Sequence, residues 1–150
     1  MQDNHSYSAQ KGVLRGLHFQ SNPCAQTKLV RVLMMVKFMT SLLIYEKVHQ
    51  LFGEWEGFIL NDQNFRELLV PRGFAHGFVT LTDNVHVAYK VDSCYSAENN
   101  CGILWNDRKI NVDWGISNPI LSEVLIKISP FDESARYFEY RNTLLISMLK

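Results

Sequence analysis

Short apolar runs, interrupted by turn-forming residues, dominate the first two thirds of the chain. The runs cover residues 13–19, 28–34, 56–60, 66–70, 76–81 and 85–91. Between them stand Asn22-Pro23, Asn61-Asp62, Pro71-Arg72-Gly73 and Asp83-Asn84. Runs of this length bounded by such residues are typical of strands, and no long helical period accompanies them. The pattern therefore predicts an all-β sandwich or barrel.

The two ends of the chain follow this pattern less clearly. Residues 2–11 are polar and predict a loop that leads into the first strand. An Asn-Pro pair at 118–119 predicts a turn, and the apolar residues 121–128 fit either a strand or a helix. Residues 141–150 predict a short amphipathic helix or a frayed tail. We expect one domain over residues 1–140, followed by this tail.

The first apolar run contains two residues that a plain strand would not carry. In GVLRGLHFQ, residues 12–20, Arg15 and His18 lie three positions apart. Strict alternation puts them on opposite faces, so a regular strand would bury either the cation or the imidazole. Burying an unpaired charge costs on the order of several kcal/mol. Either anions or waters meet this side chain inside the protein, or the strand lies at an edge with one polar face in water.

Composition narrows the class of protein. The chain has 150 residues, of which 47% are hydrophobic, enough for one domain with a sizeable core. Lysine plus arginine and aspartate plus glutamate are balanced at 15 each, so no overall field favours nucleic acid or an anionic membrane. Cys24, Cys94 and Cys101 lack CxxC spacing and are expected to be free thiols. The absence of a long apolar run or a basic leader leads us to expect a cytoplasmic protein.

Five blocks of the sequence, taken in order, carry a family resemblance. They are GVLRGLHFQ, QTKLVRV, PRGFAHGF, AYKVDSCYSAEN and GILWND. Together they resemble the dTDP-4-dehydrorhamnose 3,5-epimerase family, over residues 2 to about 114 and more weakly beyond. The resemblance implies a cupin-type jelly roll, a homodimer, a nucleotide-sugar substrate, and chemistry without a cofactor or metal. The expected reaction is epimerisation at C3 and C5 of a dTDP-linked 4-keto-6-deoxyhexose.

The same resemblance assigns roles to individual residues. It implies that His18 is the base that removes a proton beside the ketone, that Lys28 is the cation near the developing enolate, and that Tyr89 is the acid. Imidazole suits a base at neutral pH, and a tyrosine hydroxyl keeps its proton until one is demanded. Tyr95 is a second candidate for the acid. The substrate-binding positions implied by the family are Gln2, Asp3, Asn4, Arg15, His76, Tyr95 and Asn100, with Arg15 and Lys28 as the diphosphate ligands.

The sequence departs from the family pattern at several positions. The chain starts just before QDNHS, where relatives carry further residues, so we expect a fragment or a mis-assigned start. The acidic residue of the family reads Asn100, and the arginine after it reads Cys101. The lysine and aspartate of the family's LSxKD segment read Val124 and Leu125. That aspartate would orient the catalytic histidine, and its loss is expected to cost several orders of magnitude in rate.

Residues 34–52, MMVKFMTSLLIYEKVHQLF, replace a family segment of the type GxxxDVAVDIRKGxPTFG. With permitted codons, a shifted frame from Met35 to Phe52 spells GKIYDVAVDIRKGAPTF. We interpret the stretch as the out-of-frame translation of a normal segment between two compensating indels. Ordinary divergence is the alternative.

Three functions from different classes follow. The first is an active nucleotide-sugar 3,5-epimerase. The second is a degraded, inactive copy that keeps the fold. The third is a metal-dependent cupin, which typically needs two histidines two residues apart and a glutamate. Position 20, two after His18, is a glutamine, and no H-x-H occurs in the sequence, which counts against the third.

Overall fold

The computed structural model describes residues 1–33, 37–44, 52–122, 127–132 and 138. Strands are the regular elements of these ranges. The first six are β1 (Gln2–Ser8), β2 (Val13–Gln20), β3 (Lys28–Leu33), β4 (Lys37–Ile44), β5 (Trp55–Asn61) and β6 (Glu67–Val70). They are followed by β7 (Phe74–Thr80), β8 (Val85–Val91), β9 (Asn100–Ile103), β10 (Ile120–Leu121) and β11 (Lys127–Ser129).

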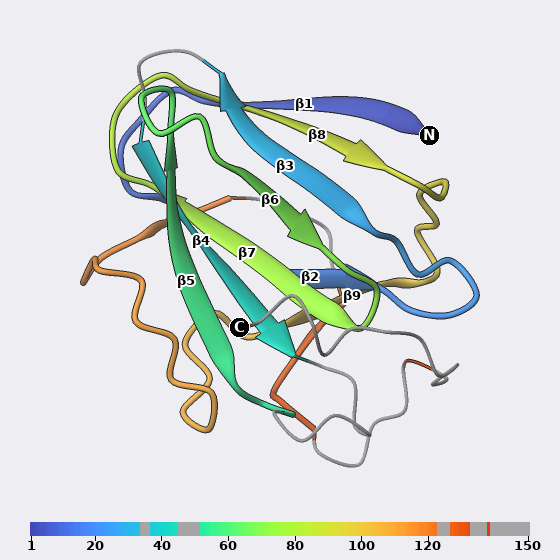
Figure 1. Cartoon of the computed structure of the whole chain (residues 1–150). Coiled ribbons are helices and arrows are strands. Elements are labelled where there is room, and N and C mark those ends of the chain that lie inside the picture. The colour runs from blue at the N-terminus through green and yellow to red at the C-terminus, as the bar shows by residue number, and fades with distance from the viewer. Residues whose placement is uncertain (34–36, 45–51, 123–126, 133–137, 139–150) are drawn as a thin grey trace.

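The described strands form two sheets that pack face to face (Figure 1). One sheet has the order β1-β8-β3-β6, and the other has the order β11-β9-β2-β7-β4-β5 with β10 paired to β2. Neighbours in the sheets are distant in the sequence, so the chain crosses repeatedly between the layers. This is a jelly-roll sandwich, and the predicted fold class is confirmed. Within the described ranges, no helix has the length and apolar character needed to cross a membrane.

The six strands predicted from apolar runs are confirmed, with boundaries shifted by up to two residues. The predicted loop over residues 2–11 is wrong for Gln2–Ser8, which pairs antiparallel with β8 along its whole length. An apolar pattern is missing there because β1 is an edge strand, with Asp3, His5 and Tyr7 exposed on one face. Of the ambiguous residues 121–128, Leu121 ends the short strand β10. The tail at 141–150 lies outside the described residues.

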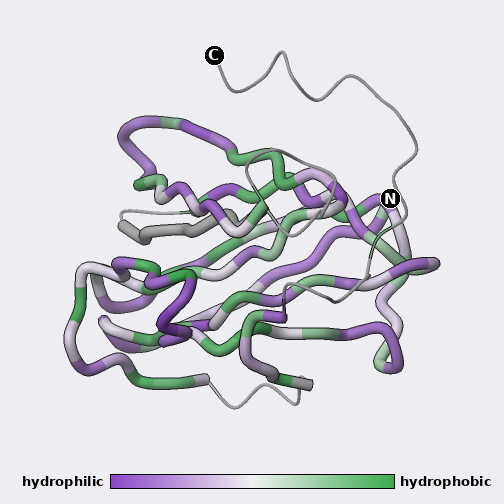
Figure 2. The backbone as a smooth tube through the Cα atoms, turned by 90° about the horizontal axis from the view of Figure 1, so that it is seen from below, coloured by the Kyte–Doolittle hydropathy of each residue, from purple (hydrophilic) through white to green (hydrophobic). Residues whose placement is uncertain are grey.

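Two hydrophobic clusters hold the sheets in place. Val30, Val70, Phe78, Val85 and Val87 pack with Leu60 in the space between the two sheets. A second cluster lies against β2 and β7 and includes Leu14, Leu17, Phe19, Val79 and Trp114. Along the backbone, hydrophobic and hydrophilic positions therefore alternate instead of forming separate blocks (Figure 2). One face of β2 is thus fully used for packing, which leaves its other face to the interior of the sandwich.

A β-bulge in β2 resolves the conflict between Arg15 and His18. Arg15 pairs with Phe78 and His18 pairs with His76, so the register against β7 shifts by one residue between them. A bulge of this kind inserts one extra residue into a strand, and both side chains then point to the same face. Gly77 makes room on β7, because a Cβ there would lie 2.9 Å from the Arg15 carbonyl oxygen. The strict alternation assumed from the sequence was therefore wrong at this point.

The segment interpreted as an out-of-frame translation, residues 34–52, contributes strand β4 to the larger sheet. β4 pairs with β7 on one side and β5 on the other, from Lys37 to Ile44. The backbone of residues 37–44 thus occupies a regular strand position. Residues 34–36 and 45–51 lie outside the described residues, and the frame interpretation stays a prediction.

Candidate active site

A cavity of about 360 Å³ opens between the sheets. Polar side chains reach it from β1, β2, β3, β8 and β9, together with residues of the loops at 26, 95 and 105. Its charged lining residues are Arg15 and Lys28, and no aspartate or glutamate is among the described residues that surround it. The cavity is therefore cationic, although the whole chain is neutral. Such a site favours an anionic ligand.

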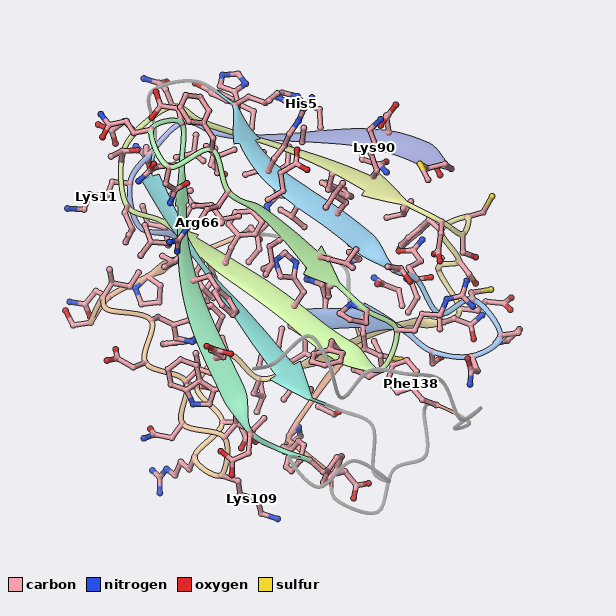
Figure 3. All side chains as sticks on the ribbon, viewed as in Figure 1. His5, Lys11, Arg66, Lys90, Lys109 and Phe138 are labelled. Carbon is pink, nitrogen blue, oxygen red and sulfur yellow. The ribbon has the colours of Figure 1, made fainter. Side chains whose placement is uncertain are left out.

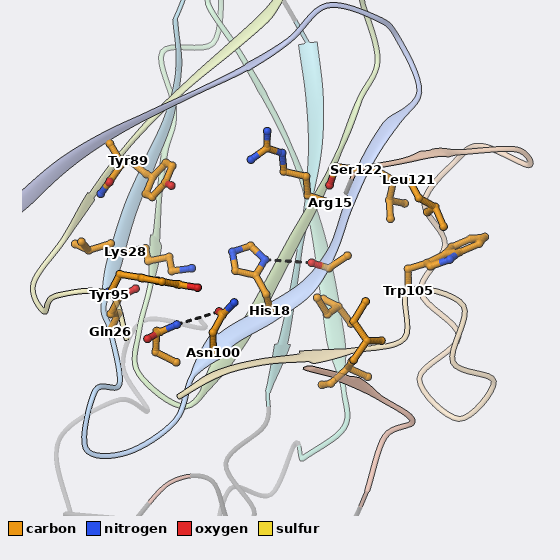
Figure 4. Close-up of a pocket in the computed structure, with 18 of the residues that line it drawn as sticks. Arg15, His18, Gln26, Lys28, Tyr89, Tyr95, Asn100, Trp105, Leu121 and Ser122 are labelled. Carbon is orange, nitrogen blue, oxygen red and sulfur yellow. Dashed lines mark hydrogen bonds between the residues drawn. The ribbon is translucent and has the colours of Figure 1, made fainter. Parts of the chain in front are cut away.

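The His18 ring is fixed by a local hydrogen bond. Its Nδ1 lies 3.1 Å from the Gly16 carbonyl oxygen, within the bulge of β2 (Figure 4). A carbonyl can only accept, so Nδ1 carries the ring proton and Nε2 keeps its lone pair. Desolvation by burial and the charge of Lys28 lower the pKa of His18 to about 3. At neutral pH the ring is a neutral base with Nε2 available.

Lys28 approaches the same ring from the opposite sheet. Figure 4 shows its side chain directed toward the His18 ring. Desolvation lowers the pKa of Lys28 to about 8, so the group is mainly an ammonium at pH 7. Among the described residues, no carboxylate forms an ion pair with it. Its charge is thus available to a ligand that brings negative charge into the cavity.

Arg15 adds a second cation at the upper part of the site in Figure 4. Its guanidinium carbon lies 5.7 Å from the centre of the Phe78 ring, a cation–π contact. Arg15 Nε is buried and has no hydrogen-bond partner among the described residues. A buried donor left unpaired costs about 1–3 kcal/mol, so an acceptor from a ligand would be stabilising at this position.

A chain of hydrogen bonds sets the polarity of Asn100. The Ser96 amide donates to Gln20 Oε1 at 2.9 Å, which leaves Nε2 as the donor end of the Gln20 amide. That nitrogen donates to Asn100 Oδ1 at 2.9 Å. The Asn100 amide nitrogen therefore points away from Gln20, and the side chain offers a donor where the family pattern has an acidic acceptor. Asn100 therefore lines the cavity as a neutral side chain with its amide nitrogen as a donor.

Tyr89 lies across the cavity from β2. It is carried by β8, where it pairs with Val30 of β3, and Figure 4 shows it on the wall opposite His18. Tyr95, on the loop after β8, is 59% exposed and lies at the rim. Of the two candidate acids, Tyr89 is therefore the one enclosed with the base. A base and an acid on opposite walls are suited to moving protons on opposite faces of one ligand.

The cavity collects eight of the residues predicted for the site. They are Gln2, Asn4, Arg15, His18, Lys28, Tyr89, Tyr95 and Asn100. His76 does not line the cavity; it is buried on β7, with its ring 5.8 Å from that of His18. Asp3 lies on the outer face of β1 and pairs with Lys90 at 3.5 Å, a position that does not support substrate binding. The family-derived positions Val124 and Leu125 lie outside the described residues.

Sequence reasoning missed several lining residues, among them Gln20, Gln26 and Trp105. Gln20 could have been found, because it lies two positions after His18 and shares its side of the strand. Trp105 gave no such signal. It reaches the site because Trp114 Nε1 donates to its carbonyl oxygen at 2.8 Å and fixes the loop after β9.

Comparison with known proteins agrees with this fold. A family model described as dTDP-4-dehydrorhamnose 3,5-epimerase matches residues 1–138. The Shigella flexneri protein of that name is 46% identical over 138 residues, which cover 92% of this chain and 75% of the relative. The Escherichia coli K12 protein is 42% identical over 133 residues, which cover 89% of this chain and 68% of the relative.

Solved structures give the same result. The Bacillus anthracis dTDP-4-dehydrorhamnose 3,5-epimerase, crystallised with TDP and pyrophosphate, has a TM-score of 0.79 and 50% identity, covering 82% of this chain and 70% of that one. A Legionella pneumophila epimerase in complex with dTDP-4-keto-L-rhamnose has a TM-score of 0.74 and 37% identity, covering 87% of this chain and 64% of that one.

A jelly roll that encloses a cationic cavity between its sheets is the architecture of a cupin-type protein. The chain belongs to the dTDP-4-dehydrorhamnose 3,5-epimerase family, whose members are isomerases.

Proposed function

We propose that this chain epimerises a dTDP-linked 4-keto-6-deoxyhexose at C3 and C5, with His18 as the base and Tyr89 as the acid. The 4-keto group of such a sugar acidifies the neighbouring C–H bonds, so the protein needs to supply only a base, an acid and a positive charge. In each half-reaction the C–H electron pair becomes the enolate double bond, and the proton passes to His18 Nε2.

Lys28 stabilises the charge that develops on the ketone oxygen. The acid on the opposite wall, Tyr89, then returns a proton to the other face of the carbon, which inverts its configuration. Arg15 holds the diphosphate, with its Nε as one donor. Gln2 and Asn4 line the cavity from the edge strand, which supports a role for them in contacting the nucleotide.

One observation carries the proposal. His18 keeps its Nε2 lone pair inside a cavity whose charged lining residues, within the described ranges, are both cations. A neutral base beside an ammonium suits proton removal from an anionic keto sugar. Burial, and then the charge of Lys28, lowers the pKa of His18 and keeps the imidazole unprotonated at neutral pH, and the ammonium favours the enolate.

Deuterium exchange tests the reaction directly. The protein is incubated in D₂O with a dTDP-4-keto-6-deoxyhexose, and exchange at C3 and C5 is followed by NMR. His18→Asn is expected to abolish exchange, and Tyr89→Phe to permit slow exchange with little inversion. Tyr7→Phe, on the outer face of β1, serves as the matched control and should leave the rate unchanged. Exchange that persists in His18→Asn at the original rate would contradict the assignment of the base.

A second candidate function is that of an inactive family member, which binds the nucleotide sugar without catalysing its epimerisation. It is favoured by the setting of His18, whose hydrogen bond among the described residues goes to a backbone carbonyl and not to a carboxylate. A carboxylate would orient the ring and stabilise the imidazolium, so its absence slows proton removal. Tight dTDP binding without exchange at either carbon would identify this candidate. Exchange at ordinary enzymatic rates would exclude it.

Two further expectations belong to the proposal. We expect a homodimer, because the family resemblance implies one and because β1 forms an edge of its sheet. Light scattering at several concentrations would report a monomer if this is wrong. We also expect the protein to act in the cytoplasm, since a charged nucleotide sugar does not cross a membrane unaided.

A further inference from the structure

Two histidines meet on the outer face of the smaller sheet, away from the cavity. His5 on β1 and His86 on β8 lie diagonally across an antiparallel pair, since Tyr7 is the direct partner of His86. His5 Nε2 lies 3.0 Å from His86 Nδ1, and the ring centroids are 5.1 Å apart. His5 is exposed and His86 is half-buried. Figure 3 shows His5 on this sheet, on the opposite side of the molecule from Lys109.

The position of His86 is well defined. The Tyr7 ring packs against it with centroids 4.7 Å apart. Tyr7 is held in turn by a hydrogen bond from its hydroxyl to Asn84 Oδ1 at 2.7 Å. Tyr7 therefore restrains the His86 ring, and the pairing of β1 with β8 fixes the backbone that carries His5. Two ligands that are already close lose little freedom when they bind a common ion.

The separation of the two nitrogens is close to that of two ligands of one ion. The observed 3.0 Å is the length of a hydrogen bond between the two rings. Metal–imidazole bonds are about 2.0–2.1 Å long, so two nitrogens bound to one ion are about 2.9 Å apart at a right angle and about 3.4 Å apart in a tetrahedral shell. Both values can be reached by a small movement of the rings, so the preferred metal follows from the ligand type. For imidazole ligands the affinity of divalent first-row ions rises to Cu²⁺ and falls again at Zn²⁺.

We propose that His5 and His86 form a chelating site for a divalent first-row transition ion, with Cu²⁺ preferred over Ni²⁺ and Zn²⁺. The juxtaposition of His5 Nε2 and His86 Nδ1 carries this inference. In the free protein one of these nitrogens donates a hydrogen to the other. On binding, that ring changes tautomer, so its proton moves to the other ring nitrogen and both lone pairs face the ion. The rings also turn until both lone pairs point at the ion. The exposed His5 makes most of this movement, because the terminal torsion of histidine is soft and Tyr7 packs against His86.

The rest of the coordination shell is open. Within the described ranges, no third histidine, cysteine, aspartate or glutamate joins the pair to form a metal cluster. Water or a small anion completes the shell, so the site is expected to bind reversibly and to exchange its ion. It is separate from the cavity, and its occupation is independent of the proposed epimerase activity.

Isothermal titration calorimetry of tag-free protein with Cu²⁺, Ni²⁺ and Zn²⁺ tests the site. One Cu²⁺ is expected per chain. His5→Asn and His86→Asn should each weaken Cu²⁺ binding by about tenfold or more, because either change removes the chelate. The double variant should bind Cu²⁺ more weakly than either single variant, because neither imidazole of the pair is left. Electron paramagnetic resonance of the Cu²⁺ form should show hyperfine coupling to two imidazole nitrogens, reduced to one in each single variant.

Control variants distinguish a specific Cu²⁺ site at His5 and His86 from non-specific binding of Cu²⁺ to other histidines. His18→Asn removes a histidine of the cavity, and Tyr7→Phe keeps the ring beside His86, so both should retain Cu²⁺ binding within about twofold. Equal weakening by His18→Asn, unchanged binding in His5→Asn, or tighter binding of Zn²⁺ or Ni²⁺ than of Cu²⁺ would each overturn the proposal. Circular dichroism of each variant verifies that the sheet is intact.

Discussion

His18 and His76 face each other on the adjacent strands β2 and β7, with their ring centroids 5.8 Å apart. Desolvation, then the charge of Lys28, lowers the pKa of His18 to about 3. Desolvation, the neighbouring His18 and Lys28 hold the pKa of His76 well below its usual value. Two imidazoles and an ammonium thus share one buried region, and the ammonium is the group that keeps its proton at neutral pH.

Acid should destabilise the protein through these two rings. Between pH 6.5 and about 3 the unfolded chain binds a proton on His18 and the folded chain does not, so the free energy of unfolding falls as pH falls. Each such histidine contributes at most about 1.4 kcal/mol per pH unit in this window. Urea unfolding at pH 7.5, 6 and 5 measures the slope, which should be smaller in His18→Asn. An unchanged slope would mean that His18 is protonated in the folded state.

The charge of Lys28 is expected to cost stability at neutral pH. Its folded pKa of about 8 lies below the ordinary 10.5, so stability rises with pH between these values and the full cost is present below pH 8. Lys28→Met should therefore increase the free energy of unfolding at pH 7, by up to about 3 kcal/mol. The gain should vanish near pH 11.

A matched lysine provides the control for this prediction. Lys90 on β8 is exposed, with its ammonium 3.5 Å from the Asp3 carboxylate. Lys90→Met should change stability by less than about 1 kcal/mol at any pH, since exposed ion pairs contribute little. Lys28→Met should also weaken dTDP binding, which would show that the charge is retained for the ligand and not for folding. A destabilised Lys28→Met protein would contradict the argument.

Asn100→Asp should change the electrostatics of the cavity with little change in shape. Gln20 can donate to a carboxylate oxygen as it does to the amide oxygen, so the side chain should keep its position. The new negative charge is expected to raise the pKa of Lys28 and to weaken dTDP binding about tenfold, by roughly 1.4 kcal/mol. Calorimetric titration with dTDP measures the effect. Tighter dTDP binding would show that Asn100 does not face the ligand's charge.

Gly77→Ala should disrupt the floor of the site. A Cβ at position 77 would lie 2.8 Å from Trp114 Cη2 and 2.9 Å from the Arg15 carbonyl oxygen, which is too close for either. Overpacking of this kind costs about 1–3 kcal/mol or more. Gly16→Ala, whose Cβ would meet Trp105 Cβ at 3.4 Å, is the comparison and should cost less. Equal stability of the two variants by urea unfolding would contradict the packing argument.

The origin of residues 34–52 can be settled at the level of DNA. The coding sequence should read GKIYDVAVDIRKGAPTF in the shifted frame from Met35 to Phe52, with a compensating indel at each end. Codons incompatible with that frame would contradict the interpretation of residues 34–52 as an out-of-frame translation. If the interpretation holds, restoring the frame should keep β4 between β7 and β5, because backbone pairing does not depend on the side chains that the shift exchanged.

The sequence alone determined the class of the fold, the family and most of the residues around the cavity. The six apolar runs predicted six strands correctly. Alternation of apolar residues and the turn residues between runs are local features of the sequence, so they can be recognised without the tertiary structure. Ordered motifs then identified His18, Lys28 and Tyr89. The pattern could not reveal β1, because an edge strand buries too little to require apolar residues.

Only the tertiary structure decided how those residues meet. The bulge between Arg15 and His18 exists because β2 must pack Leu14 and Leu17 on one side while both polar side chains face the cavity on the other. The pKa of Lys28, the polarity of Asn100 and the contact of His5 with His86 depend on neighbours from other strands. Burial and charge are sums over such neighbours, and positions far apart in a chain acquire them only when the sheets close.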